Sequence, residues 1–152
     1  MTNAPVLGEW ILEQVSDALI YADREGNIAR WNQAACDMFG YGANEALGES
    51  LDLIIPEHLR PAHWAGFHRA MDSGRTTLLG RPTLTRASHK SGRKLYVEMT
   101  FALVKDPGGA VLGSVAMARD VTERMEKERA ARKAAAAAAG PAPSGPRPPD
   151  AP

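Results

Sequence analysis

Residues 95–103 read LYVEMTFAL, the clearest strand pattern in the chain. Apolar side chains alternate there with mostly polar ones, at Leu95, Val97, Met99, Phe101 and Leu103. Because successive side chains of a strand point to opposite faces, this alternation predicts a long strand with one buried face. The turn-forming segment 106–109 follows it, and the apolar run 111–119 predicts the last strand of the chain.

Three further strands are predicted upstream. Residues 18–23 and 27–31 predict two of them, with Gly26 among the turn formers between them. Residues 78–86 predict the third. Its Pro82 favours a position at the edge of the sheet, since proline lacks the N–H that a central strand must donate.

Three helices are predicted between these strands. Asn32 can cap the first, and Gly40 is well placed to end it. A short second helix is predicted over residues 44–47. The third begins near Pro61, which suits a first helical turn, and runs to about Asp72.

The third helix carries a histidine within its apolar stripe. At 100° per residue, one side presents Ala62, His63, Gly66, Phe67 and Ala70. His68 points away from that side. A neutral imidazole directed into an apolar pocket is a good axial ligand for haem iron. A buried histidine that only donates to a carbonyl oxygen is the simpler interpretation of the same position.

The two ends of the chain predict elements outside the sheet. Residues 6–15 have an apolar stripe with helical spacing, and residues 121–133 predict an exposed helix with favourable i,i+4 charge pairs. The alanine run 134–139 follows. The proline-rich segment 140–152 is expected to be disordered.

Composition excludes several classes of partner. The 18 basic and 18 acidic residues cancel, so no net field draws the chain to nucleic acid or to an anionic membrane. No apolar run approaches the roughly 20 residues that cross a bilayer. The N-terminal residues do not resemble a signal peptide. The lone Cys36 excludes an internal disulfide and fits a reducing, cytoplasmic location.

No catalytic motif is found, and we expect the chain not to be an enzyme. It lacks a nucleophile elbow, a phosphate-binding glycine loop and an ordered cluster of acidic metal ligands. The four histidines lack the i,i+4 spacing that aligns ligands on one helix, so we discount them as a metal-binding set. Cys36 lies among apolar neighbours and is interpreted as a packing residue.

Taken in order, several short segments resemble a PAS domain, a sensor module of many bacterial signalling proteins. The resemblance rests on Ala18–Asp23, Glu25–Asn27, Ile28–Asn32, Phe39–Tyr41, Ile55–Leu59, His89–Gly92 and Ala118–Arg124. It implies an α+β fold, with a five-stranded antiparallel sheet and helices enclosing a small pocket. The expected organisation is an N-terminal flanking helix (1–17), the PAS domain (18–122), a C-terminal signalling helix (123–139) and a disordered tail (140–152).

Residues 59–63 resemble the segment that carries the proximal haem ligand in PAS oxygen sensors. The resemblance implies haem b held by His63, with Arg81 placed to hydrogen-bond bound O₂ and Met99 and Phe101 lining the distal side. Phe67, on the same helical face as His63, completes the candidate pocket. A non-covalent flavin, or no cofactor at all, remains open, since Arg81 also fits a solvated position at a sheet edge.

The segment Asp120–Thr122 matches the Asp-x-Thr motif where a PAS domain joins its output helix. Thr122 is expected to cap that helix, and Asp120 to pair with a basic group nearby. We expect a homodimer formed through the flanking helices, and output through a kinase or another effector acting in trans. The alternative is a cofactor-free interaction module. A ligand sensor requires a cavity bounded by His63, Met99 and Phe101, whereas the interaction module requires those side chains in mutual contact.

Overall fold

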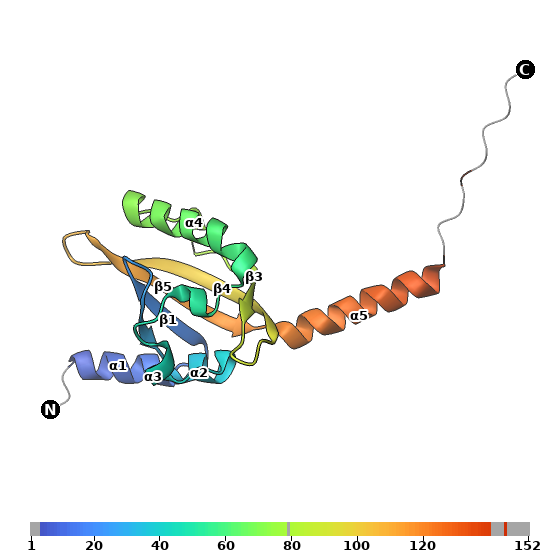
Figure 1. Ribbon diagram of the computed structural model, residues 1–152, viewed down its shortest axis with the longest axis horizontal. Coiled ribbons are helices and arrows are strands. Elements are labelled where there is room, and N and C mark those ends of the chain that lie inside the picture. Colours follow the sequence, from blue (N-terminus) through green and yellow to red (C-terminus); the bar gives the residue numbers. More distant parts are fainter. Residues whose placement is uncertain (1–3, 79, 141–144, 146–152) are drawn as a thin grey trace, which may run out of the picture. The chain divides into compact units, whose positions relative to one another are not determined.

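The computed structural model describes residues 4–78, 80–140 and 145 (Figure 1). Residues 1–122 form one compact unit and residues 123–152 another. The first unit contains a five-stranded antiparallel sheet with the order β2-β1-β5-β4-β3. Its strands are β1 (Ala18–Asp23), β2 (Ile28–Trp31), β3 (Thr83–Ser88), β4 (Lys94–Lys105) and β5 (Val111–Asp120). The predicted α+β class, the antiparallel sheet and the edge position of β3 are confirmed.

One face of the sheet is buried, as the alternation along β4 predicts. Leu95, Val97 and Met99 are buried, and β4 pairs with β5 so that Met99 lies opposite Ala118. The buried face is covered by helical segments: α2 (Gln33–Phe39), α3 (Ala43–Ala46), the 3₁₀ turns Leu51–Leu53 and Glu57–Leu59, and α4 (Arg60–Ser73). Figure 1 shows α4 lying over this face.

Asn32 joins the N-terminal part of the domain to the sheet. Its side chain is buried, and its Oδ1 accepts from the backbone N–H groups of Leu19 (2.9 Å) and Ala35 (3.0 Å). The bond from Ala35 is the predicted cap of α2. Its Nδ2 donates to the carbonyl oxygens of Leu12 (2.9 Å) and Asp17 (3.0 Å). One side chain therefore holds together the end of α1 (Ala4–Gln14), the start of β1 and the start of α2.

The strand predicted over residues 78–86 is wrong in its boundaries. β3 begins only at Thr83, because the backbone first turns back on itself. The N–H of Arg81 donates to the carbonyl of Leu78 at 2.9 Å, and Gly80 has a φ of 74°. A left-handed residue favours glycine and breaks an extended segment.

The C-terminal helix α5 spans Thr122–Ala139, so it continues through the alanine run. The predicted disorder of residues 140–152 falls outside the described residues, apart from Gly140 and Gly145. Of the helices that the structure describes, none has the length and apolar character needed to cross a membrane.

Candidate functional site

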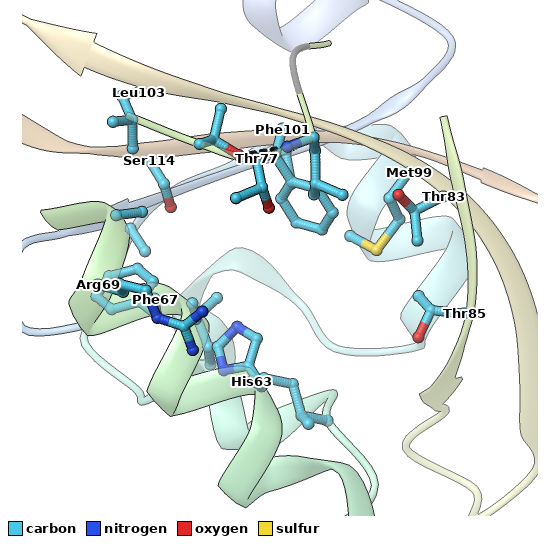
Figure 2. A pocket seen from close by; sticks show the side chains of 18 of the residues that line it. His63, Phe67, Arg69, Thr77, Thr83, Thr85, Met99, Phe101, Leu103 and Ser114 are labelled. Atoms are coloured by element: carbon cyan, nitrogen blue, oxygen red, sulfur yellow. Dashed lines mark hydrogen bonds between the residues drawn. The ribbon is translucent and has the colours of Figure 1, made fainter. Parts of the chain in front are cut away.

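A cavity of about 650 Å³ lies between α4 and the buried face of the sheet. Its size falls within the range of small-molecule sites, and its wall is mostly apolar. Side chains from α4, β3, β4 and β5 line it, together with residues of β1 and of the turns before α4. Figure 2 shows the cavity with side chains from α4 on one side and from the strands on the other.

The apolar stripe predicted on α4 faces this cavity. Its wall includes every member of that stripe: Ala62, His63, Gly66, Phe67 and Ala70. His68 is exposed and stacks against Trp64 with a centroid separation of 5.8 Å. A helical period of 3.6 residues therefore separates the two histidines as expected, one toward the cavity and one toward solvent.

His63 contributes a buried polar atom with unused bonding capacity to the cavity wall. Its Nδ1 is buried and has no hydrogen-bond partner within the described part of the chain. Burial lowers the pKa of His63 below its ordinary value, and His68 adds to this, whereas the nearby Asp52 carboxylate acts in the opposite direction. A lowered pKa keeps the imidazole neutral at pH 7, which is the form that ligates a metal.

A hydrogen bond and an ion pair, which the sequence did not indicate, hold the N-terminal half of α4 in place. Asp52 Oδ1 accepts from Trp64 Nε1 at 2.8 Å and lies 3.7 Å from Arg60 Nε. On its other side, the Trp64 ring covers Gly26 so closely that a Cβ there would lie 2.3 Å from the ring. Because Trp64 directly follows His63, this contact positions the cavity face of α4. No motif marks Asp52, Trp64 and Gly26 as partners.

The residues predicted to surround a ligand are only partly brought together. Met99 and Phe101 line the cavity from β4, and Thr83 and Thr85 line it from β3 (Figure 2). Arg81 is exposed and does not belong to the lining. Its guanidinium donates to the carbonyl oxygens of Leu78 and Thr77 at 3.4 and 3.5 Å. Its role toward a bound gas stays a prediction.

The junction after β5 differs in detail from the expected cap. Asp120 Oδ1 accepts from the backbone N–H of Thr122 at 2.9 Å, so the aspartate caps the start of α5. The Thr122 hydroxyl is buried and bonds instead to the backbone of Tyr96 on β4, accepting from its N–H at 3.0 Å. The hydroxyl faces β4 because the Val121 N–H also donates to the Tyr96 carbonyl.

Two other predicted features lie away from the cavity. Cys36 is half-buried and packs against the core. Among the described residues, no group of three or more His, Cys, Asp and Glu side chains could hold a metal ion. Haem iron can be held by a single protein imidazole as its proximal ligand. His63 fits that position, since it faces the cavity and its Nδ1 is unsatisfied.

Comparison with sequence families gives a match over most of the chain. The family model described as the PAS fold matches residues 12–126. The oxygen sensor protein DosP of Escherichia coli (strain K12) is 26% identical over 117 residues, which cover 77% of this chain and 14% of DosP. The sensor protein FixL of Bradyrhizobium diazoefficiens is 23% identical over 118 residues, which cover 78% of this chain and 23% of FixL. The chain thus spans less than a quarter of either relative.

Solved structures share the fold. The PAS domain of a Colwellia psychrerythraea protein superposes with a TM-score of 0.68 at 19% identity, covering 80% of this chain and 99% of that one. An RNA-binding light-oxygen-voltage receptor superposes with a TM-score of 0.66 at 23% identity, covering 87% of this chain and 37% of that one. At these identities the likeness concerns the fold alone.

Proposed function

The chain belongs to the PAS-fold family of sensory and signalling modules, and from this premise we propose that its cavity binds haem b through His63. The observation that carries the proposal is the buried, unsatisfied Nδ1 of a neutral imidazole in the wall of a large, mostly apolar cavity. Leaving such an atom without a partner costs free energy, which a ligand can recover. The similarity to an oxygen sensor protein supports the same proposal.

The side chains of the cavity wall would have separate roles in binding haem. His63 would hold the haem iron from α4, and Phe67 packs beside His63 with a centroid separation of 6.0 Å. Met99 and Phe101 approach from the opposite wall. Haem iron, when bound, offers the chemistry of binding a diatomic gas.

The signal would leave along β4. Tyr96 lies three residues before Met99, and its backbone N–H and carbonyl bond to Thr122 and Val121 at the start of α5. A shift of β4 that accompanies ligand binding therefore changes the bonds that fix the first turn of α5. A two-state element biased by a ligand needs such a differential contact. The effector that reads α5 in trans, and the cytoplasmic location, stay predictions.

The first test is a titration of the purified chain with haemin, followed by reduction and addition of CO. We expect a Soret band that saturates at one haemin per chain and shifts with CO. A spectrum that stays that of free haemin would reject haem binding and favour the cofactor-free interaction module. A flavin spectrum in the protein as purified would reject haem in favour of the flavin alternative.

We also propose that the chain dimerises through α1. Every side chain from Val6 to Ile11 is exposed, including Leu7 (51%), Trp10 (54%) and Ile11 (53%). α1 contacts α2, and the Arg30–Glu9 ion pair and the Asn32 bond to Leu12 also join it to its own domain. An exposed apolar stripe on a short helix is stabilised when a two-fold partner covers it.

Substituting Trp10→Glu is expected to convert the dimer to a monomer, because a carboxylate in the centre of the apolar stripe must lose its water when the interface closes. Sedimentation velocity at several concentrations measures the change. Leu112→Glu is the matched control, since Leu112 is similarly exposed (45%) but lies on β5. A wild-type chain that stays monomeric at high concentration, or a Trp10→Glu variant that still dimerises, would contradict the proposed interface.

A further inference from the structure

Two arginines border the cavity near the C-terminal end of α4. Arg69 extends from α4 at the edge of the cavity (Figure 2), and Arg75 follows Gly74, which ends the helix. Apart from His63 and Arg86, the rest of the wall is apolar or carries hydroxyl groups. Among the described residues, no Asp or Glu lines the cavity. The site therefore combines an apolar interior with an uncompensated positive edge.

Neither guanidinium has a hydrogen-bonding or ion-pair partner within the described part of the chain. Arg60 and Arg119, by contrast, both face a carboxylate. Arg86 also borders the cavity, but its guanidinium bonds to the Tyr96 hydroxyl and lies 5.3 Å from the Tyr96 ring centroid. Arg69 and Arg75 are therefore the cavity arginines whose guanidinium N–H groups have no partner among the described residues.

A third cation reinforces this end of the cavity. The Nζ of Lys105 lies 3.9 Å from the position that a Cβ would take at Gly74. Cations near the C-terminus of a helix are attracted by its dipole, and this attraction acts whether or not a ligand is present. The helix dipole explains why positive charge is tolerated at the C-terminal end of α4. It does not account for two guanidinium groups that edge an apolar cavity with no carboxylate in its wall.

We propose that the cavity takes an amphipathic carboxylate, with its apolar body against Met99 and Phe101 and its carboxylate at the edge, bound by Arg69 and Arg75. A guanidinium offers planar, paired donors that match a carboxylate. This inference rests on the proposed function in one respect, which is that the cavity binds a ligand. It does not require iron, and it names fatty-acid-like molecules as a ligand class.

Calorimetric titration of the full chain with dodecanoate and with dodecan-1-ol, below their aggregation limits, tests the inference. The two probes share an apolar chain and differ in the carboxylate. We expect dodecanoate to bind about tenfold more tightly than the alcohol, as a charge-assisted pair at a partly exposed edge allows. In the double variant Arg69→Gln/Arg75→Gln, dodecanoate affinity should fall about tenfold while alcohol affinity stays within about twofold.

Arg93→Gln is the control, since Arg93 is an exposed arginine in the turn between β3 and β4, outside the cavity wall. Equal affinity for the two probes, no binding of either, or unchanged dodecanoate affinity in the double variant would overturn the inference. Haemin titration of the same samples separates the two proposals. Dodecanoate binding without haem uptake rejects haem alone, and haem uptake without dodecanoate binding rejects the carboxylate site alone.

Discussion

Replacing His63 by alanine is expected to abolish haem uptake while the domain stays folded. The imidazole is the proposed iron ligand, and its removal leaves mostly apolar contacts around the porphyrin. Folding should suffer little, because the substitution also removes a buried Nδ1 that has no partner in the described structure. Haemin titration measures binding, and urea denaturation of the haem-free protein measures stability.

The matched control is His68→Ala, which removes the same side chain from the exposed side of α4 and should leave the Soret band unchanged. Added imidazole provides a second check. If His63 acts as the ligand, free imidazole should enter the space left by the alanine and restore a Soret band. Retention of haem by His63→Ala with an unchanged spectrum would show that the iron, if bound, is held elsewhere.

The fold was predictable because its signals are local. The alternation along β4 indicated the buried face, and Asn32 and Gly40 marked the bounds of α2. The edge position of β3 is confirmed, although Pro82, on which that prediction rested, lies just before the strand. The start of β3 was not predictable to the same degree. There the turn at Gly80 competes with an apolar run that also suits a strand.

The cavity face of α4 was also predictable, since the helical period alone places His63 and Phe67 together. The helical period could not predict which atom each polar side chain bonds to. The Asp52–Trp64 bond joins residues from separate segments, and the Thr122 hydroxyl bonds across to β4. Such long-range pairs depend on tertiary packing, so no local pattern indicates them. The sequence did not single out Arg69 and Arg75, because only the structure shows that both line the cavity.

Replacing Asn32 by alanine is expected to destabilise the domain by about 3 kcal/mol or more, which is large for a single polar side chain. Alanine removes all four hydrogen bonds of the Asn32 side chain at once. Because Asn32 is only 3% exposed, water does not readily replace the lost partners of Leu19 and Ala35. Urea denaturation gives the difference in the free energy of unfolding.

The variant Asn32→Asp separates the stability contributed by the acceptor oxygen of the amide from that contributed by its donor nitrogen. Aspartate keeps both acceptor positions but loses the two donors to the carbonyl oxygens of Leu12 and Asp17. Its charge then faces those oxygens in a buried position, which is unfavourable. We therefore expect Asn32→Asp to destabilise as well, with the loss concentrated at the link between α1 and β1. Gln33→Ala is the control, since its side chain is exposed and bonds only to Asp37 one turn away. If Asn32→Ala cost no more than Gln33→Ala, the four bonds would contribute no net stability, and the link between α1 and the sheet would depend on other contacts.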